Sequence, residues 1–413
     1  MPLKRAVITG VGAVTPFGYG DEELWQGLKS GRSACRRMTE WDGFTGLKSL
    51  VGAPLDMRDA RTIPRQSRRT MSPMSIFAAQ AAELALDSAG LARADFAGNR
   101  QAGVIVGHTT GSPQTLTEVY RQLLPTGDFG LLTSSSFFRC LSHTAALNLA
   151  QYLEVRGLVA ATSAACASGL QAVGAAFDLI RLGRQRMVLC GGAEELHPTV
   201  TGSFDILYAA SAGYNQNPEM TPRPFDRERD GLVCAEGAGL LLLEEYDHAR
   251  ARQAPIFGEV VGYHSCGNGS HISQSNPEAM VDCMRGALAD AGLQAADIDY
   301  LNAHATGTLQ GDAAEAAAIR EVFADRVPTS SLKGHLGHTL GASGPIELIA
   351  TLRMMREGLL LPTRNLRQVA DDCTDIQHLQ KALPKPTRHI LKNSFAFGGI
   401  NAALICARPE REH

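Results

Sequence analysis

Thr162-Ser163-Ala164-Ala165-Cys166-Ala167-Ser168-Gly169 carries the strongest structural signal in the chain. A short apolar strand is predicted before it, over residues 158–162, and the residues after it are apolar or small on nearly every face of a helix. A helix with that pattern is buried on all sides. Strand, tight turn and buried helix together resemble a nucleophile elbow, which exposes one side chain above a parallel sheet.

Cys166 is predicted to lie in the first turn of this helix. Amide N–H groups and the positive end of the helix dipole favour a thiolate there, so we expect a lowered pKa. A cysteine considered alone is more often an inert buried residue. The other residues around Cys166 therefore decide between the two interpretations.

The rest of the chain alternates short apolar strands with helices. We predict strands over residues 6–11, 102–106 and 298–301, and helices near residues 22–29, 75–89 and 144–152. This alternation predicts an α/β fold with largely parallel sheets.

A faint internal repeat suggests that one α/β unit occurs twice. Ala167-Ser168-Gly169 opens a helix followed by a strand at residues 187–190, and Ala342-Ser343-Gly344, 175 positions later, lies in a helix followed by residues 359–362. Glycine-rich segments at 236–239 and 397–401 each precede another apolar run. We expect two halves, residues 1–251 and 252–413, whose central helices cross closely. Chance similarity between glycine-rich segments is the alternative.

Composition is that of an ordinary globular protein. The 413 residues are 44% hydrophobic and 20% charged, with a formal net charge of −3, which argues against nucleic acid or an anionic membrane as a partner. No run approaches the ~18 apolar residues of a membrane-spanning helix. The start resembles a signal peptide, but Thr9, Gly10 and Gly12 interrupt it, which favours a strand. Nine scattered cysteines without a CxxC pair argue against disulfides and structural zinc, so we expect a cytoplasmic protein.

Two histidines are predicted at the ends of strands, where open α/β sheets bind ligands. His304 lies in Asn302-Ala303-His304, and His338 closes the segment Lys333-Gly334-His335-Leu336-Gly337-His338. Together with Cys166 they indicate a reactive centre. A Cys–His–His zinc site is the competing interpretation, although a structural zinc site takes four ligands.

These motifs make the family recognisable. The resemblance runs from Val7-Ile8-Thr9-Gly10-Val11-Gly12, through Ala165-Cys166-Ala167-Ser168-Gly169, Arg223-Pro224-Phe225-Asp226, Arg229-Asp230-Gly231 and Asn302-Ala303-His304, to Asn393-Ser394-Phe395-Ala396-Phe397-Gly398-Gly399. With them the chain resembles the elongating β-ketoacyl-[acyl carrier protein] synthases, condensing enzymes of the thiolase-fold superfamily, and most of all the type II enzymes of bacterial fatty-acid synthesis. That family implies a duplicated αβαβα layered fold. Initiating relatives use Cys-His-Asn, whereas this chain has Cys-His-His.

The resemblance implies a decarboxylative Claisen condensation. Cys166 would carry the acyl chain, and His304 and His338 would donate hydrogen bonds to the enolate oxygen formed when a malonyl thioester loses carbon dioxide. Backbone N–H groups of Cys166 and Phe397 would form the oxyanion hole, and Phe397 would also act as a gate. Neither a cofactor nor a metal is expected, because phosphopantetheine arrives on the carrier protein.

Further roles follow from the same resemblance. Lys333 would keep both imidazoles neutral, and Glu315 is expected to pair with Lys333, the alternative being a solvated helix residue within 313–319. Thr306 and Thr308 would hold the pantetheine arm. Ser273 and Thr110 are likewise assigned to substrate binding.

The expected partners are acyl and malonyl thioesters on an acidic acyl carrier protein. Arg65, Arg68 and Arg69, with Arg61, form a basic cluster, and the first three match docking positions of the family; a solvated helix start is the alternative. A homodimer is also expected, with one sheet edge paired to its twin near residues 137–143.

Several departures from the family pattern limit the assignment of a pathway. Ala396 and Ile400 replace the usual glycine and threonine of the gate, the segments 211–216 and 268–273 differ, and residues 107–111 and 139–143 are unusually polar. A paralogue that elongates a polyene, polyketide or other unusual acyl chain is therefore the alternative to fatty-acid elongation. A non-catalytic chain-length partner is a third possibility, but such subunits lack the nucleophile.

Overall fold

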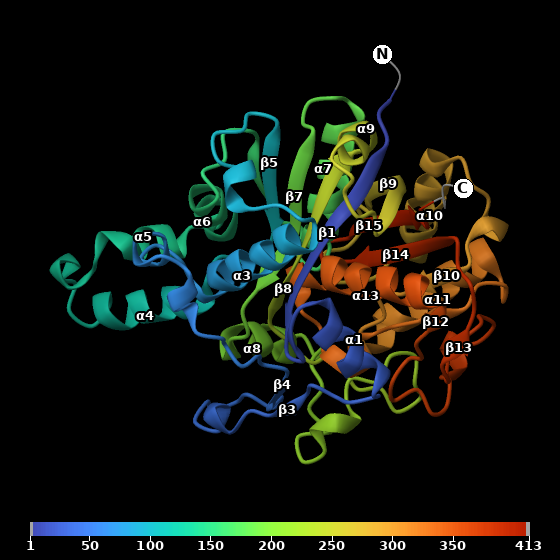
Figure 1. Ribbon diagram of the computed structural model, residues 1–413. Coiled ribbons are helices and arrows are strands. Elements are labelled where there is room, and N and C mark those ends of the chain that lie inside the picture. The colour runs from blue at the N-terminus through green and yellow to red at the C-terminus, as the bar shows by residue number, and fades with distance from the viewer. Residues whose placement is uncertain (1–2, 410–413) are drawn as a thin grey trace.

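A computed structural model describes residues 3–409, and its strands form one mixed sheet (Figure 1). The sheet has eleven strands, of which β2 (Gly18–Tyr19) pairs only with β1. In sheet order the other ten are β11 (Thr329–Ser330), β10 (Tyr300–Asn302), β14 (His389–Phe395), β15 (Ile400–Ala407), β9 (Gly258–Gly267), β1 (Ala6–Thr15), β8 (Gly237–Glu245), β7 (Met187–Glu194), β5 (Ala102–Gly107) and β6 (Val159–Thr162).

The two halves of this sheet repeat one topology. When the strands of each half are numbered along the chain, their order from the outer edge of the sheet to its centre is third, second, fourth, fifth and first. The two first strands, β1 and β9, pair antiparallel at the centre. In each half the second strand is parallel to the third and fourth, and the remaining pairs are antiparallel. The expectation of largely parallel sheets is therefore wrong. A short turn such as residues 396–399, between β14 and β15, can join only antiparallel strands.

The sequence repeat had aligned one pair of strands incorrectly. Residues 359–360 form β12 (Leu359–Leu360), which pairs with β13 (Leu383–Pro384) in a separate small sheet. The topological counterpart of β7 is β14, and the counterpart of β8 is β15. Another small sheet joins β3 (Arg36–Arg37) to β4 (Val51–Gly52).

The two halves of the continuous sheet form two β layers, and helices between them and on their outer faces complete five layers, αβαβα. Helices α3 (Pro73–Ser88) and α6 (Thr144–Tyr152) cover the outer face of the N-terminal half, and α10 (Pro277–Ala291) and α11 (Leu309–Phe323) cover that of the C-terminal half. Helices α7 (Ser168–Arg181) and α13 (Ser343–Glu357) contact each other and strands of both halves. Separate apolar clusters fill the central and the two outer interfaces.

The central helices begin in backbone contact. A Cβ at Gly169 would lie 2.3 Å from the carbonyl oxygen of Gly341, so only glycine permits this approach. The crossing expected from the small residues is present. It places the turn that carries Cys166 against the C-terminal half.

The remaining helices are shorter or peripheral. They are α1 (Asp21–Lys29), α2 (Arg65–Arg68), α4 (Pro113–Leu123), α5 (Ser134–Cys140), α8 (Pro198–Ile206), α9 (Tyr246–Ala251) and α12 (Lys333–Leu336), and α4 and α5 project from the body (Figure 1). The division into residues 1–251 and 252–413 stays a prediction; it falls at the end of α9, between two halves that share one sheet. Within residues 3–409, no helix is both long and apolar enough to cross a bilayer.

Candidate active site

A tight turn between β6 and α7 presents Cys166. Ala165 adopts a left-handed backbone with a φ of 47°, which is uncommon for a residue with a side chain. The Ser168 hydroxyl accepts a hydrogen bond from the Ala164 N–H (2.8 Å) and donates one to the Ala165 carbonyl oxygen (2.6 Å), which holds the turn closed. The helix begins at Ser168, so Cys166 lies just before it and not in its first turn.

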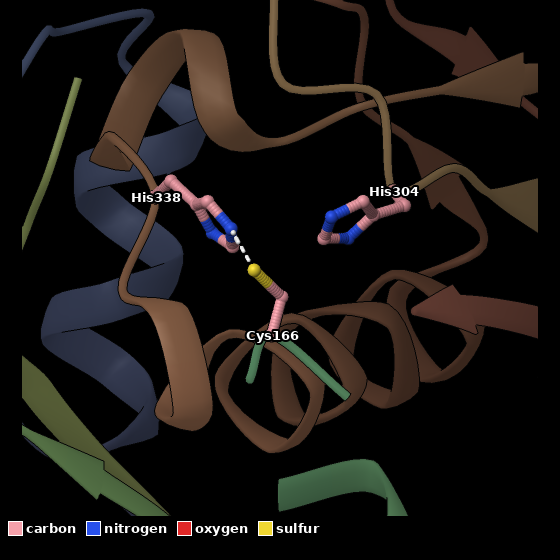
Figure 2. Close-up of side chains that lie close together, drawn as sticks. All are labelled: Cys166, His304 and His338. Atoms are coloured by element: carbon pink, nitrogen blue, oxygen red, sulfur yellow. Dashed lines mark hydrogen bonds between the residues drawn. The ribbon is translucent and has the colours of Figure 1, made fainter. Parts of the chain in front are cut away.

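Both predicted histidines lie beside the thiol. His338 Nε2 is 3.0 Å from Cys166 Sγ, and the ring centroids of His304 and His338 are 5.1 Å apart at an angle of 78° (Figure 2). All three side chains are buried. Each half of the molecule therefore contributes to one centre, with the thiol from the N-terminal half and the imidazoles from the C-terminal half.

The expected thiolate is not favoured at rest. Burial raises the pKa of the Cys166 thiol to about 12, and the nearby Lys333 charge only partly opposes this effect. The prediction of a lowered pKa was wrong because it considered the backbone N–H groups and the helix dipole but not burial, which has the largest effect. Burial, followed by the positive charge of Lys333, lowers the pKa of both His304 and His338 well below the usual value, so both rings are neutral.

Neither histidine is fixed in one tautomer by the protein. Within residues 3–409, the Nδ1 atoms of His304 and His338 have no hydrogen-bond partner. A neutral imidazole donates from one ring nitrogen and accepts at the other, and the tautomer depends on the partners of both. Nε2 of His338 can therefore accept the thiol proton in one step and donate a hydrogen bond in another.

The carboxylate that pairs with Lys333 is Glu347, which corrects the predicted pairing with Glu315. Lys333 Nζ lies 2.7 Å from Glu347 Oε1, and a second buried lysine, Lys392, places its Nζ 2.6 Å from Oε2. Burial alone would raise the pKa of Glu347, but the two ammonium groups outweigh it and lower the pKa to about 2. Glu347 projects from central helix α13, and its negative charge acts on His338.

Glu315 instead supports the backbone of His304. Its carboxylate accepts hydrogen bonds from the N–H groups of His304 (2.9 Å) and Ala305 (2.6 Å) and from Asn393 Nδ2 (3.1 Å). Asp312, one turn earlier on α11, accepts the N–H groups of Thr306 (2.9 Å) and Gly307 (3.1 Å). Glu315 is buried, so it is not a solvated helix residue.

Sequence reasoning missed four polar residues of this support. They are Asp312, Glu347, Lys392 and Asn393, all buried. A usable signal was present, because Glu347 interrupts the apolar run Ile346-Glu347-Leu348 and Lys392 follows Ile390-Leu391 in a strand. A charge within an apolar element of secondary structure needs a buried partner.

Most of the predicted substrate-binding residues share one cavity. Ser273, Thr306, Thr308 and Phe397 line it together with the three central residues (Cys166, His304, His338) and Glu315. An outer cavity of about 470 Å³ shares Ser273, Thr308 and Phe397 and continues past Leu207 and Tyr208. Thr110 lines neither of them, and its hydroxyl donates to the Gly111 carbonyl oxygen at 3.1 Å, so its assignment stays a prediction.

The donor atoms of the three central residues could also hold a metal, since they lie within 4.8 Å of one another. Within residues 3–409, no fourth His, Cys, Asp or Glu atom joins this group. A structural zinc site uses four protein ligands, so the set does not fit one.

The basic cluster lies on and around α2. Arg65 and Arg69 are exposed and Arg68 is half-buried. Arg61 is paired with Asp59 at 2.7 Å, so an acidic residue also lies beside the cluster.

Comparisons with known proteins identify the family. The N-terminal domain of β-ketoacyl synthases matches residues 4–249, and the C-terminal domain matches residues 257–367. The 3-oxoacyl-[acyl-carrier-protein] synthase 1 of Escherichia coli strain K12 is 35% identical over 406 residues, covering 98% of each chain.

Two solved structures extend the likeness to the whole fold. A β-ketoacyl synthase from Burkholderia phymatum STM815 has a TM-score of 0.95 and 42% identity, covering 98% of this chain and 100% of the other. A type II polyketide ketosynthase, solved with its acyl-carrier protein and bound to a hexaketide, has a TM-score of 0.90 and 30% identity, covering 99% and 100%. The chain, with its cysteine and two histidines at the crossing of a duplicated fold, belongs to the β-ketoacyl synthase family.

Proposed function

We propose that Cys166, His304 and His338 carry out the decarboxylative condensation of an acyl-enzyme thioester with malonyl-[acyl carrier protein], giving β-ketoacyl-[acyl carrier protein] in fatty-acid elongation. The observation that carries the proposal is the 3.0 Å contact between Cys166 Sγ and His338 Nε2, with the His304 ring beside it in the same cavity. This arrangement joins a nucleophile to two neutral imidazoles.

The first half-reaction transfers the acyl group to Cys166. Sulfur attacks the thioester carbonyl, the bond to the pantetheine sulfur breaks, and the thiol proton ends on that departing sulfur. His338 Nε2 is close enough to carry the proton between the two sulfur atoms. Because burial disfavours the resting thiolate, sulfur loses its proton only as the attack proceeds.

The second half-reaction forms a carbanion without a strong base. Loss of carbon dioxide from the malonyl group leaves negative charge on the thioester oxygen, and N–H groups of His304 and His338 stabilise it. Both rings are neutral, so each donates without losing a proton. The carbanion attacks the acyl carbon on Cys166 and the C–S bond breaks, leaving its electron pair on sulfur. The Cys166 thiolate then takes up a proton from solvent, and the product chain is two carbons longer.

We further propose that an acyl carrier protein docks on Arg65, Arg68 and Arg69 and that its pantetheine arm enters through the outer cavity beside Thr308 and Phe397. The arm arrives with the substrate, so no resident cofactor is proposed. The proposed location is the cytoplasm.

A homodimer is proposed through the free edge of β6. Val159 is 45% exposed on this edge strand, and Phe137 is 65% exposed on α5. Edge strands with exposed apolar side chains favour pairing with another chain. A monomer by sedimentation at micromolar concentration would contradict the proposal.

One experiment tests the proposed reaction directly. Incubation with acyl- and malonyl-[acyl carrier protein] should give an acyl adduct on Cys166 by mass spectrometry and a product two carbons longer. A chain-length partner subunit without catalysis would show no adduct and would not react with cerulenin at Cys166. Product formation without any adduct would contradict the ping-pong mechanism.

A second candidate function is elongation of a polyene or polyketide chain. The polar residues His108, Thr109 and Thr110, together with Ser142 and His143, favour it. The mass of the adduct on Cys166, measured across carrier substrates of different chain length and unsaturation, separates the two functions. A preference for saturated chains supports fatty-acid elongation, and a preference for unsaturated or oxygenated chains supports the alternative.

A further inference from the structure

A second buried lysine, Lys392, acts on both catalytic histidines and has no part in the proposed reaction. Lys392 lies on β14 with its side chain fully buried. Its Nζ is 2.6 Å from Glu347 Oε2 and donates to the Asn393 carbonyl oxygen at 2.7 Å. Charged side chains are rarely buried this completely without a specific partner.

Lys392 changes the net charge of the buried group that contains Lys333 and Glu347. Lys333 and Glu347 alone would form a neutral ion pair, 2.7 Å apart. With Lys392 on the other carboxylate oxygen, two ammonium groups share one carboxylate, and the three residues together carry one net positive charge. Ser343 Oγ donates to the same carboxylate at 2.6 Å and adds no charge.

The charge of Lys392 is felt at both histidines. At Cys166 the Lys333 charge lowers the pKa of the thiol and the buried Glu194 carboxylate raises it. Burial is the largest cause of the lowered pKa of His304 and of His338, and both Lys333 and Lys392 lower each of them further. Burial lowers the pKa of Lys392 to about 8, Glu347 opposes this and Lys333 adds to it, so Lys392 is protonated at neutral pH. Glu315 is the other carboxylate that acts on Lys392.

Strand β14 also connects the two buried carboxylates, Glu315 and Glu347. Asn393, next to Lys392, donates to Glu315, and Glu315 holds the backbone of His304. Lys392 holds Glu347, and Glu347 holds Lys333. Two adjacent residues of β14 thus connect the carboxylates of α11 and α13.

We propose that Lys392 is a positioning residue which, by sharing Glu347 with Lys333, makes the environment of Cys166, His304 and His338 cationic and so stabilises anions formed there. Neither lysine lines the cavity that holds Cys166, so both act through other groups. The anions concerned are the thiolate, the tetrahedral oxyanion and the enolate, and the inference rests on the proposed function for the last two.

The rate at which iodoacetamide alkylates Cys166 tests the inference, because alkylation reports the thiolate and requires no substrate. Lys392→Gln removes the charge and keeps a hydrogen-bond donor toward Glu347. We expect alkylation at neutral pH to slow about tenfold, the change that one pKa unit produces, and its rise to shift to higher pH. Mass spectrometry of the Cys166 peptide separates it from the other cysteines.

Two further variants make the result specific. Lys381→Gln removes the same charge from the exposed surface and should leave the profile unchanged. Lys392→Arg keeps the charge and should retain the wild-type pH dependence of Cys166 alkylation. If folded Lys392→Arg is alkylated as slowly as Lys392→Gln, the effect comes from side-chain shape and the inference is overturned.

The sign of the change separates charge from structure. Loosened packing would hydrate the thiol and speed alkylation, whereas loss of positive charge slows it. A folded Lys392→Gln variant with unchanged or faster alkylation overturns the inference. Failure of condensation in the wild-type enzyme would overturn the proposed function and leave this result standing.

Discussion

The turns before the two central helices share a backbone and differ in side chain. Ala165 and Leu340 both have a φ of 47°, and each lies three residues before its helix, α7 or α13. The next residue is Cys166 in the N-terminal half and Gly341 in the C-terminal half. The duplicated fold therefore offers two equivalent positions for a nucleophile, and only one carries it.

Packing explains why the second position is a glycine. A Cβ at Gly341 would lie 2.7 Å from the Cα of His108 and 2.8 Å from Glu194 Oε2. Cys166 instead faces the cavity shared with both histidines. The two helices also differ in charge. The position in α7 that corresponds to Glu347 of α13, 175 residues earlier, is Ala172. The N-terminal half supplies the nucleophile, and the C-terminal half supplies the charges.

The largest expected effect divides the chemistry between the halves. Cys166→Ala should lower condensation by at least about 10³-fold, because Cys166 is the one cysteine among the described residues that line the cavity. Malonyl decarboxylation should persist, since the imidazoles remain in place. Both rates are measured as product and carbon dioxide released; condensation at the wild-type rate would sink the assignment.

Removing the Glu347 carboxylate of α13 should lower the free energy of unfolding. Glu347→Gln leaves Lys333 and Lys392 without a counter-charge, and breaking a buried ion pair costs about 3–5 kcal/mol. The folded-state pKa of about 2 lies below the ordinary 4.5, so the contribution of Glu347 is present above pH 4.5 and is lost as the pH falls toward 2. Urea unfolding should show the difference between variant and wild type narrowing over this range; a constant difference would contradict the assignment.

Variants of the two histidines should lose decarboxylation, the step that Cys166→Ala retains. His304→Ala and His338→Ala should each lower decarboxylation by about 10²–10³-fold, the effect of deleting one donor to a developing oxyanion. Carbon dioxide release from malonyl-[acyl carrier protein] in a Cys166→Ala background measures this step alone. If either variant decarboxylates at the rate of its background, that ring has another role.

The turn that contains Gly341 should not tolerate a side chain at the position that corresponds to Cys166. Gly341→Ala places a Cβ against the backbone of His108, and overpacking of a buried site costs about 1–3 kcal/mol. Thermal unfolding should report this loss. Gly43→Ala is the control, because the Cβ position of Gly43 has open space around it and Gly43, like Gly341, has no positive φ. Equal losses in both variants would contradict the clash as the reason for the glycine at position 341.

The smallest effect concerns Arg65, Arg68 and Arg69, which lie on and around α2 and not in the two turns. Reversing Arg65, Arg68 and Arg69 to Glu should raise KM for carrier-bound substrates and flatten its salt dependence, because exposed charges act mainly on encounter. Turnover of a short pantetheine thioester should barely change. Equal losses on both kinds of substrate would show that docking lies elsewhere.

Local patterns anticipated the elements and the reactive trio. The strand before Cys166, the buried helix after it and the helix at residues 144–152 were expected from apolar spacing, and α6 has those bounds. Cys166, His304 and His338 were found because polar residues at strand ends stand out against apolar neighbours. The expected pairing of Lys333 with Glu315 failed, since the partner Glu347 comes from a helix whose rotation no local pattern specifies.

The amino-acid sequence by itself determined the α/β alternation, the duplication and the three reactive residues, because each depends on spacing along a few consecutive positions. Only the tertiary structure decided the mixed strand directions, the raised pKa of Cys166, the Lys333–Glu347–Lys392 group and the exclusion of a side chain at Gly341. Those features depend on burial and on distances between residues far apart in the chain. Electrostatic energies and steric clashes change over a few ångströms, which spacing along the sequence does not record.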